Sequence, residues 1–362
     1  MNGKIKTDAL EVARLACDTM MKKFDAPQLP PEGWFHYHQG VFLSGMMNIY
    51  KICGDEKYYE YVKAWVDARV ADDGTISILD RTRLDDIQPG ILLFDIYDRT
   101  KKEKYKKALE TLIGILRTWH KNEAGGFWHK EMHPNEMWLD GIYMAGPIQA
   151  EYGMRSGESS LTDEAAKQAV IMWENMRDEK TGLLYHAWDC TKKIDWADKK
   201  TGLSSAFWGR SVGWYTVALL DILSFTDKES SYYKVLSDIE RELLESVIKY
   251  QSGSSGMWYQ VIDKTERSDN WCEVSCSCLF TASIARAVKM GILPEKYLVY
   301  AEKGFKGVYN SLKTENGNLL IGGVCVGTGV CDYAGYVSRP TSVNDLHGVG
   351  AFLLMCAAIL NI

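Results

Sequence analysis

The segment SAFWGRSVGWYTVALLDILS, residues 205–224, decides the fold. At helical spacing its apolar residues cover almost the whole circumference, and a helix of that kind is buried on all sides. Five other segments have the same character, and they span residues 40–53, 86–98, 138–152, 271–290 and 344–360. The sequence therefore predicts six inner helices.

Amphipathic segments lie between these inner helices. One begins at Asp55 and places Tyr58, Tyr61 and Trp65 on one face, which is typical of a half-buried helix. The repeat supplies five such outer helices, and residues 7–24 supply a sixth. Because a helical repeat that closes on itself needs no capping units, we predict an all-α fold. It is an (α/α)6 barrel, or six-hairpin toroid, formed by residues 1–362 as a single domain.

The composition is that of an ordinary globular chain of 362 residues with a net charge of −6. A mildly acidic chain is not a general binder of nucleic acid, and no apolar run reaches the ~18 residues of a membrane span. Residues 1–24 lack the apolar stretch of a secretory signal. The nine cysteines are an odd, scattered set, which indicates reduced thiols and a cytoplasmic location.

Unusual residues gather where each inner helix begins. In a closed barrel these points meet at one rim, and an aromatic-lined pocket with a few polar groups is the expected ligand site. The candidates are Tyr37, Asp85, His129, Trp138, Asp140, His186, Trp208, Arg210 and Trp214.

Each candidate also has a plainer structural interpretation. Asp140 lies in an apolar setting that should raise its pKa and suit it to donate a proton. Asp85 and Asp86 can instead cap a helix N-terminus. Arg210 lies in an otherwise apolar helix and needs an anionic partner, either a structural aspartate or a substrate carboxylate. His186 and the three tryptophans are also residues that commonly pack in a core.

The sequence lacks the motifs of several other classes of protein. The chain contains no phosphate-binding loop, no dinucleotide fingerprint and no GxSxG nucleophile turn. Its histidines and carboxylates do not show metal-ligand spacing, and Cys272, Cys276 and Cys278 lack a CxxC pair. We therefore expect no cofactor and no metal.

Five segments at the rim match a known pattern. They read LDDIQPG from Leu84, EMWLDGIYMA from Glu136, TGLLYHAWD from Thr181, FWGRSVGW from Phe207, and GYV from Gly335 on to Asn344-Asp345. With these segments the chain resembles glycoside hydrolase family 105, the unsaturated rhamnogalacturonyl hydrolases. That family is related to the unsaturated glucuronyl hydrolases of family 88. The resemblance runs from about residue 34 to the C-terminus.

The resemblance implies an (α/α)6 barrel and an unusual reaction. Family members hydrate the C4=C5 double bond that polysaccharide lyases leave on a terminal uronic acid. The aspartate matching Asp140 is the general acid and base, and Asp85 matches a second carboxylate. The residues matching sugar contacts are Tyr37, His129, Trp138, His186, Trp208, Arg210 and Trp214.

The resemblance leaves the substrate open. The first expectation is an unsaturated galacturonyl unit on a product of pectin or rhamnogalacturonan lyases. The alternative is an unsaturated glucuronyl unit from glycosaminoglycan or another polysaccharide. The loops 121–136 and 190–204 would form the subsite for the leaving sugar. A catalytically inactive sugar-binding protein, an inverting glycosidase and a sugar epimerase are the other readings of the same barrel. The sequence does not fix the oligomeric state.

Overall fold

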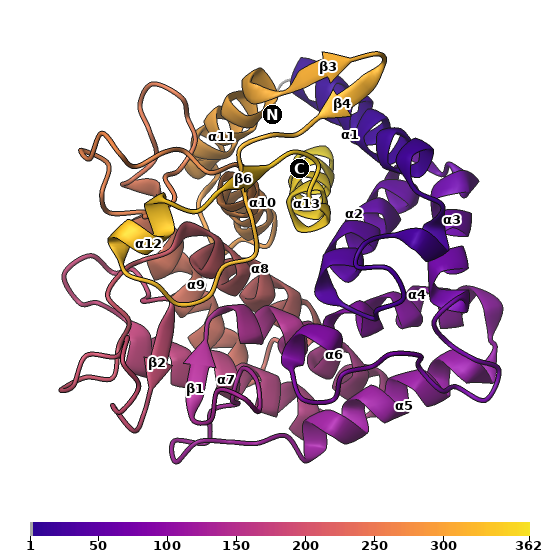
Figure 1. The fold of residues 1–362 in the computed structure, drawn as a ribbon, viewed down its shortest axis with the longest axis horizontal. Coiled ribbons are helices and arrows are strands. Elements are labelled where there is room, and N and C mark those ends of the chain that lie inside the picture. The colour runs from indigo at the N-terminus through magenta and orange to yellow at the C-terminus, as the bar shows by residue number, and fades with distance from the viewer. Residues whose placement is uncertain (1–2) are drawn as a thin grey trace.

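Two concentric rings of helices make up the computed structural model, which describes residues 3–362 (Figure 1). The inner ring consists of α2 (Tyr37–Cys53), α4 (Ile91–Thr100), α6 (Asp140–Ser156), α8 (Gly209–Phe225), α10 (Val274–Lys289) and α13 (Leu346–Leu360). The outer ring consists of α1 (Gly3–Lys23), α3 (Glu56–Asp67), α5 (Glu103–Arg117), α7 (Ser159–Met176), α9 (Ser231–Ile248) and α11 (Leu298–Ser311). The predicted all-α six-hairpin barrel is confirmed.

The ring closes where the last inner helix, α13, packs against the first, α2 (Figure 1). Glycines permit this close approach. A Cβ on Gly45 of α2 would lie 2.6 Å from the Cβ of Leu353, and one on Gly350 of α13 would lie 2.5 Å from the backbone of Val41. Side chains at these two positions would push the helices apart, so the seam depends on both glycines.

Three inner helices, α4, α8 and α10, begin at least three residues later than predicted. α4 begins at Ile91 because two 3-10 turns, Leu84–Asp86 and Gln88–Gly90, precede it, and Pro89 lacks the N–H that a longer helix would use. α8 and α10 begin at Gly209 and Val274, after extended residues that form isolated β-bridges.

Short strands cover the end of the barrel at which the inner helices begin. They pair antiparallel: β1 (Glu136–Trp138) with β2 (Ala187–Asp189), β3 (Lys313–Glu315) with β4 (Asn318–Leu320), and β5 (Val324–Cys325) with β6 (Thr341–Ser342). The connecting segments also hold the short helix α12 (Tyr333–Val337) and 3-10 turns at Ala26–Gln28 and Glu295–Tyr297. The register aligns Trp138 with Ala187, which brings the residues next to them into one site.

The cysteines form no disulfide within residues 3–362, where all nine lie, and most of them are buried. In the same described range, no helix is both long and apolar enough to cross a membrane.

Glu240 of α9 makes stability depend on pH. The side chain is fully buried, and neither carboxyl oxygen has a hydrogen-bond partner among the described residues. Burial raises the pKa of Glu240 well above its usual 4.5, so the folded protein holds this proton to a higher pH than the unfolded chain does. As pH rises above about 4.5, the free energy of unfolding therefore falls by about 1.4 kcal/mol per pH unit, until the pKa of Glu240 in the folded state is reached.

We expect Glu240→Gln to raise Tm relative to wild type at pH 8, with a much smaller difference at pH 5. Thermal unfolding at both pH values measures this, with the exposed Glu110→Gln of α5 as the control. A Tm difference independent of pH would show that Glu240 does not titrate in this way.

Candidate active site

Asp140 is the first residue of α6, and the pairing of β1 with β2 places His186 beside it. His186 Nε2 lies 3.1 Å from Asp140 Oδ2, and His186 Nδ1 lies 2.6 Å from the hydroxyl of Tyr336. Because a carboxylate only accepts, Nε2–H donates to Asp140, and Nδ1 accepts the hydroxyl proton of Tyr336. The Tyr336 oxygen in turn accepts from the backbone N–H of Cys331, 3.0 Å away. This chain of hydrogen bonds fixes the imidazole and holds the carboxylate.

The charge state of Asp140 differs from the sequence expectation. Burial alone would raise its pKa, but the hydrogen bond from His186 and the positive charges of His129 and Arg210 outweigh burial. The pKa of Asp140 therefore lies below its usual 3.8, and the expectation of a raised pKa is wrong. The neighbours of Asp140 along the chain are apolar, whereas the groups that lower its pKa come from segments that only the fold brings to it. In the protein without substrate, Asp140 is a carboxylate at neutral pH.

Asp85 is buried in a separate cluster of charges. Its Oδ2 lies 2.9 Å from Lys130 Nζ, and its Oδ1 lies 3.6 Å from His129 Nε2. Burial acts to raise the pKa of Asp85, but His129 and Lys130 lower it to about 2. Burial also lowers the pKa of His129 to about 4, so Lys130 carries the positive charge at neutral pH.

Neither Asp85 nor Asp86 caps a helix with its side chain. The helix-cap alternative is therefore wrong for both. Asp86 instead accepts the backbone N–H of Asp80 at 3.0 Å and lies 3.3 Å from Arg83 Nε, so it holds the loop that carries Asp85.

The guanidinium of Arg210 donates hydrogen bonds to two backbone carbonyls. It donates to the carbonyl oxygens of Cys325 and of Val326, the latter at 2.9 Å, and lies 4.4 Å from the centre of the Trp208 ring. The predicted structural aspartate is wrong, because no carboxylate of the described chain pairs with Arg210. Arg210 instead fixes the segment after β5 against the start of α8.

The aromatic candidates divide into two groups. Trp138 stacks on His129 with ring centres 4.6 Å apart and meets the edge of His186 at 5.6 Å. Trp208 stacks on Tyr336 at 5.7 Å. These two tryptophans therefore flank the Asp140–His186 pair.

The remaining two aromatic candidates are Trp214 and Tyr37. Trp214, one turn beyond Arg210, is fully buried and stacks on Tyr143 at 4.5 Å, so its neighbour is another core ring. Tyr37 begins α2 and is half-buried. Burial raises the pKa of Tyr37; the positive charge of Arg210 opposes this rise, and the negative charges of Asp85 and Asp140 add to it.

The sequence analysis did not nominate Tyr336. The only signal was its place in the segment Gly335-Tyr336-Val337, which matched the family pattern without an assigned role. Tyr336 is fully buried in α12 and lies 150 positions from His186 in the chain.

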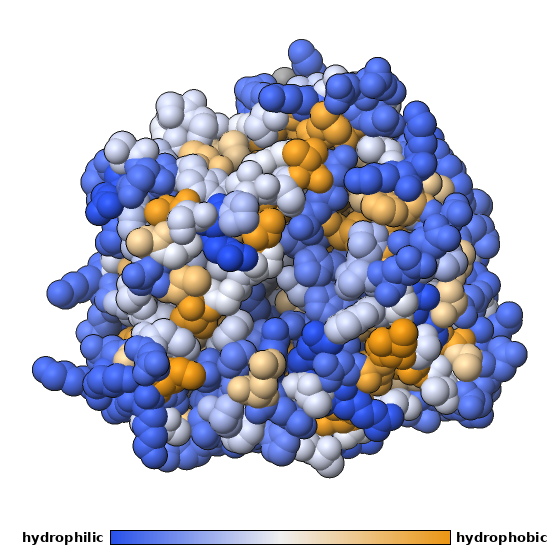
Figure 2. Space-filling model, viewed as in Figure 1, coloured by the Kyte–Doolittle hydropathy of each residue, from blue (hydrophilic) through white to orange (hydrophobic). Residues whose placement is uncertain are grey.

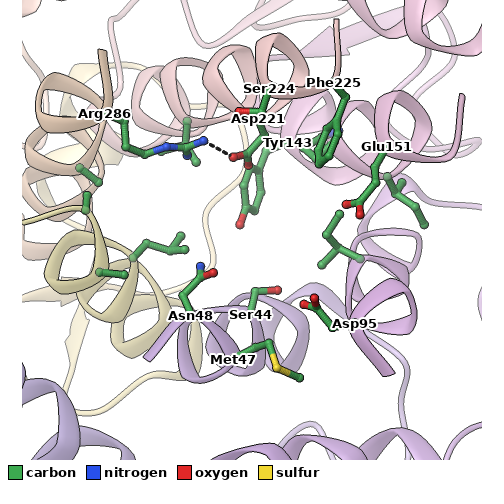
Figure 3. Close-up of a pocket in the computed structure, with 18 of the residues that line it drawn as sticks. Ser44, Met47, Asn48, Asp95, Tyr143, Glu151, Asp221, Ser224, Phe225 and Arg286 are labelled. Carbon is green, nitrogen blue, oxygen red and sulfur yellow. Dashed lines mark hydrogen bonds and ion pairs between the residues drawn. The ribbon is translucent and has the colours of Figure 1, made fainter. Parts of the chain in front are cut away.

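The face carrying these groups is hollowed at its centre (Figure 2). A second cavity, of about 680 Å³, lies within the barrel and is lined mainly by the C-terminal halves of the inner helices (Figure 3). Its charged side chains pair with one another: Asp221 lies 2.6 Å from Arg286, and Asp95 lies 2.8 Å from Lys51. None of the nine predicted site residues lines it. This cavity is therefore distinct from the cluster of predicted site residues, which lies where the inner helices begin.

At one end of a barrel of six helix pairs, a partly buried aspartate and a buried histidine lie beside two tryptophans, an arrangement typical of a small-molecule site. The family model described as Glycosyl Hydrolase Family 88 matches residues 12–362. The chain therefore belongs to this glycoside hydrolase family, and it is a glycoside hydrolase.

Individual relatives confirm the resemblance to family 105. A family 105 glycoside hydrolase from C. acetobutylicum ATCC 824 is 31% identical, with a TM-score of 0.92 over 97% of this chain and 99% of that one. The unsaturated rhamnogalacturonyl hydrolase YesR of Bacillus subtilis strain 168 is 23% identical over 328 residues, which cover 89% of this chain and 88% of that protein. An unsaturated glucuronyl hydrolase from Bacillus sp. GL1 shares the fold, with 13% identity and a TM-score of 0.72 over 97% and 96% of the two chains.

Proposed function

We propose that this enzyme removes a Δ4,5-unsaturated uronic acid from the non-reducing end of small lyase products. The observation that carries the proposal is the Asp140 carboxylate, held by His186 between two tryptophans at the rim of a family 88 barrel. One carboxylate set between aromatic rings suits a reaction in which a single group first gives and then takes a proton. In this proposal residues 1–362 act as one catalytic domain.

The proposed reaction starts with proton transfer from Asp140 to C4 of the sugar. The electron pair of the C4=C5 bond forms the new C–H bond, and positive charge appears at C5 and the ring oxygen. Water then adds to C5 and gives its proton to the same carboxylate, which restores the acid. The hemiketal at C5 opens: its hydroxyl becomes a ketone, the bond from C5 to the ring oxygen breaks, and the ring oxygen takes the proton to become a hydroxyl at C1. The resulting hemiacetal at C1 then collapses to an aldehyde, the C1–O bond to the leaving sugar breaks, and the C1 hydroxyl proton passes to the leaving oxygen. The two-carboxylate displacement of ordinary glycosidases is not involved.

The neighbouring groups have distinct proposed roles. Asp85 supplies negative charge that favours the cation at C5. Trp138 and Trp208 form apolar walls around the flat, unsaturated ring. Arg210 stays charged while it donates to two carbonyls, and it contributes positive potential for the uronate carboxylate. Tyr37, His129 and Trp214 complete the predicted contacts.

We propose unsaturated galacturonyl-rhamnose, a product of pectin breakdown, as the preferred substrate. The support is the likeness over most of the chain to YesR, which is named as an unsaturated rhamnogalacturonyl hydrolase. We also propose a cytoplasmic location, supported by nine cysteines without a disulfide among the described residues.

The direct test follows the ultraviolet absorbance of the conjugated C=C–carboxylate group. We expect the absorbance to fall when the purified enzyme acts on unsaturated galacturonyl-rhamnose, because hydration destroys the chromophore. Decay with an unsaturated glucuronyl disaccharide alone would move the substrate to the alternative class. If neither substrate decays while one of them still binds, the chain is a sugar-binding protein and the proposed reaction is wrong.

A further inference from the structure

Three metal-ligating side chains meet at the seam where the barrel closes. His38 lies in the first turn of α2, Asp345 directly precedes α13, and His347 lies in the first turn of α13. One ligand atom from each lies within 4.8 Å of the other two. The distance from Asp345 Oδ1 is 3.8 Å to His38 Nε2 and 2.7 Å to His347 Nδ1. None of these residues belongs to the site derived above.

The hydrogen bonds of His38 leave one ring nitrogen without a proton. His36 Nδ1 accepts from the backbone N–H of His38, so it is an unprotonated nitrogen. His38 Nδ1 lies 3.0 Å from that atom and must therefore be the donor. The neutral His38 ring then carries no proton on Nε2, and this lone pair faces Asp345.

His347 also turns a ring nitrogen toward Asp345. Its Nε2 lies 3.1 Å from the carbonyl oxygen of Cys325, which can only accept, so Nε2 carries the proton. Nδ1, the other nitrogen of this fully buried ring, lies 2.7 Å from Asp345 Oδ1 and therefore faces the carboxylate.

Asp345 is held in place and is not used for helix capping. Its side chain makes no cap hydrogen bond at the start of α13, and its Oδ2 accepts from the hydroxyl of Ser342 at 3.2 Å. His38 Nε2, His347 Nδ1 and an oxygen of Asp345 thus converge, and each of these atoms can be a metal ligand. A cation between them would interact favourably with all three.

We propose that His38, Asp345 and His347 bind a divalent transition-metal ion such as Zn²⁺. Two histidines and one aspartate are a common protein ligand set for zinc, with bonds of about 2.0–2.2 Å and a further position for water. The outer nitrogens of both rings already donate to fixed acceptors, which is the usual arrangement around a metal-binding histidine. Imidazole nitrogens bind Zn²⁺ in preference to Mg²⁺. The guanidinium of Arg210 donates to the same Cys325 carbonyl as His347, and its positive charge disfavours a weakly bound cation.

The position gives the ion a structural consequence. His38 lies on the first inner helix and His347 on the last, so the metal would bridge the two helices that close the ring. It would also hold the Cys325 carbonyl through His347, and that same carbonyl accepts from Arg210. The bound ion therefore stabilises the closed barrel next to the active site.

The test uses the full chain, stripped with a chelator and incubated with Zn²⁺ alone. After gel filtration we expect one Zn²⁺ per chain by elemental analysis, and a rise in Tm of about 3–5 °C when free Zn²⁺ is a hundredfold above Kd. His38→Gln and Asp345→Asn should each weaken Zn²⁺ binding at least about 100-fold. His120→Gln is the matched control, because His120 pairs with Glu131 outside the cluster.

The absorption spectrum of bound Co²⁺ distinguishes binding at this site from binding to the cysteine thiols of the chain. Co²⁺ bound to nitrogen and oxygen gives visible bands without the ultraviolet charge-transfer band of a cobalt–thiolate bond. We expect that spectrum in wild type and its loss in His38→Gln, whose metal-free Tm should stay near that of wild type because His38 is partly exposed. Failure of stripped wild type to retain Zn²⁺, or equal retention by both ligand variants, would overturn the proposal. In that case a proton on His347 neutralises the cluster.

Discussion

Asp140→Asn is expected to stop the loss of the C4=C5 absorbance while leaving substrate binding nearly intact. Asparagine has the same size and can still interact with His186, but it neither gives nor takes the proton. General acid–base groups contribute about 10²–10⁴-fold, and Asp140 performs both steps, so we expect kcat to fall by at least about 10³-fold with little change in KM. The exposed Asp163→Asn of α7 should behave as wild type.

The pH profile of wild type tests the same role independently. The pKa of Asp140 is lowered in the free enzyme, so its protonated fraction falls tenfold for each pH unit above that pKa. We expect kcat/KM to fall with rising pH on this limb. A bound uronate adds a like charge that raises the pKa of Asp140, so the fall in kcat should begin at higher pH than the fall in kcat/KM. Near wild-type turnover by Asp140→Asn would show that another group is the acid.

The fold was predictable because an inner helix is buried on all sides and therefore has apolar residues on all its faces. Segments such as 205–224 and 344–360 are apolar on all sides, and only a helix surrounded by other helices needs such a composition. The starts of α4, α8 and α10 were less predictable. There the chain stays in turns or short bridges, which depend on partners elsewhere in the sequence.

The site was predictable in its members but not in its connections. Asp140 and His186 stood out as polar residues in apolar surroundings, and the barrel brings them together. The hydroxyl of Tyr336, the carbonyls that hold Arg210 and the pairing of His38 with Asp345 all come from the segment 324–347, far from their partners in the chain. The pattern of residues within one segment does not predict contacts with distant segments. For the same reason, spacing along the chain did not indicate the metal site that we propose.

Asp85→Asn gives the second large expected effect, and its neighbour Asp86 provides a matched comparison. Both carboxylates are buried in the same turn, but their surroundings differ. His129 and Lys130 lower the pKa of Asp85 to about 2, whereas burial raises the pKa of Asp86 to about 7. Asp85 is thus a permanent negative charge near the site, while Asp86 acts mainly as a hydrogen-bond acceptor for Asp80.

The two variants should therefore separate catalysis from stability. Asp85→Asn removes the charge that favours the C5 cation, and a preorganised electrostatic group of this kind contributes about 10²–10³-fold to kcat. Asp86→Asn keeps a side-chain oxygen for Asp80, so kcat should stay within about threefold while Tm changes. Steady-state kinetics and thermal unfolding of both proteins measure the contrast. Equal losses of kcat in the two variants would mean that Asp85 only supports the loop. A loss of kcat confined to Asp85→Asn would support a role for its charge in the reaction, because both aspartates are buried neighbours in the same turn.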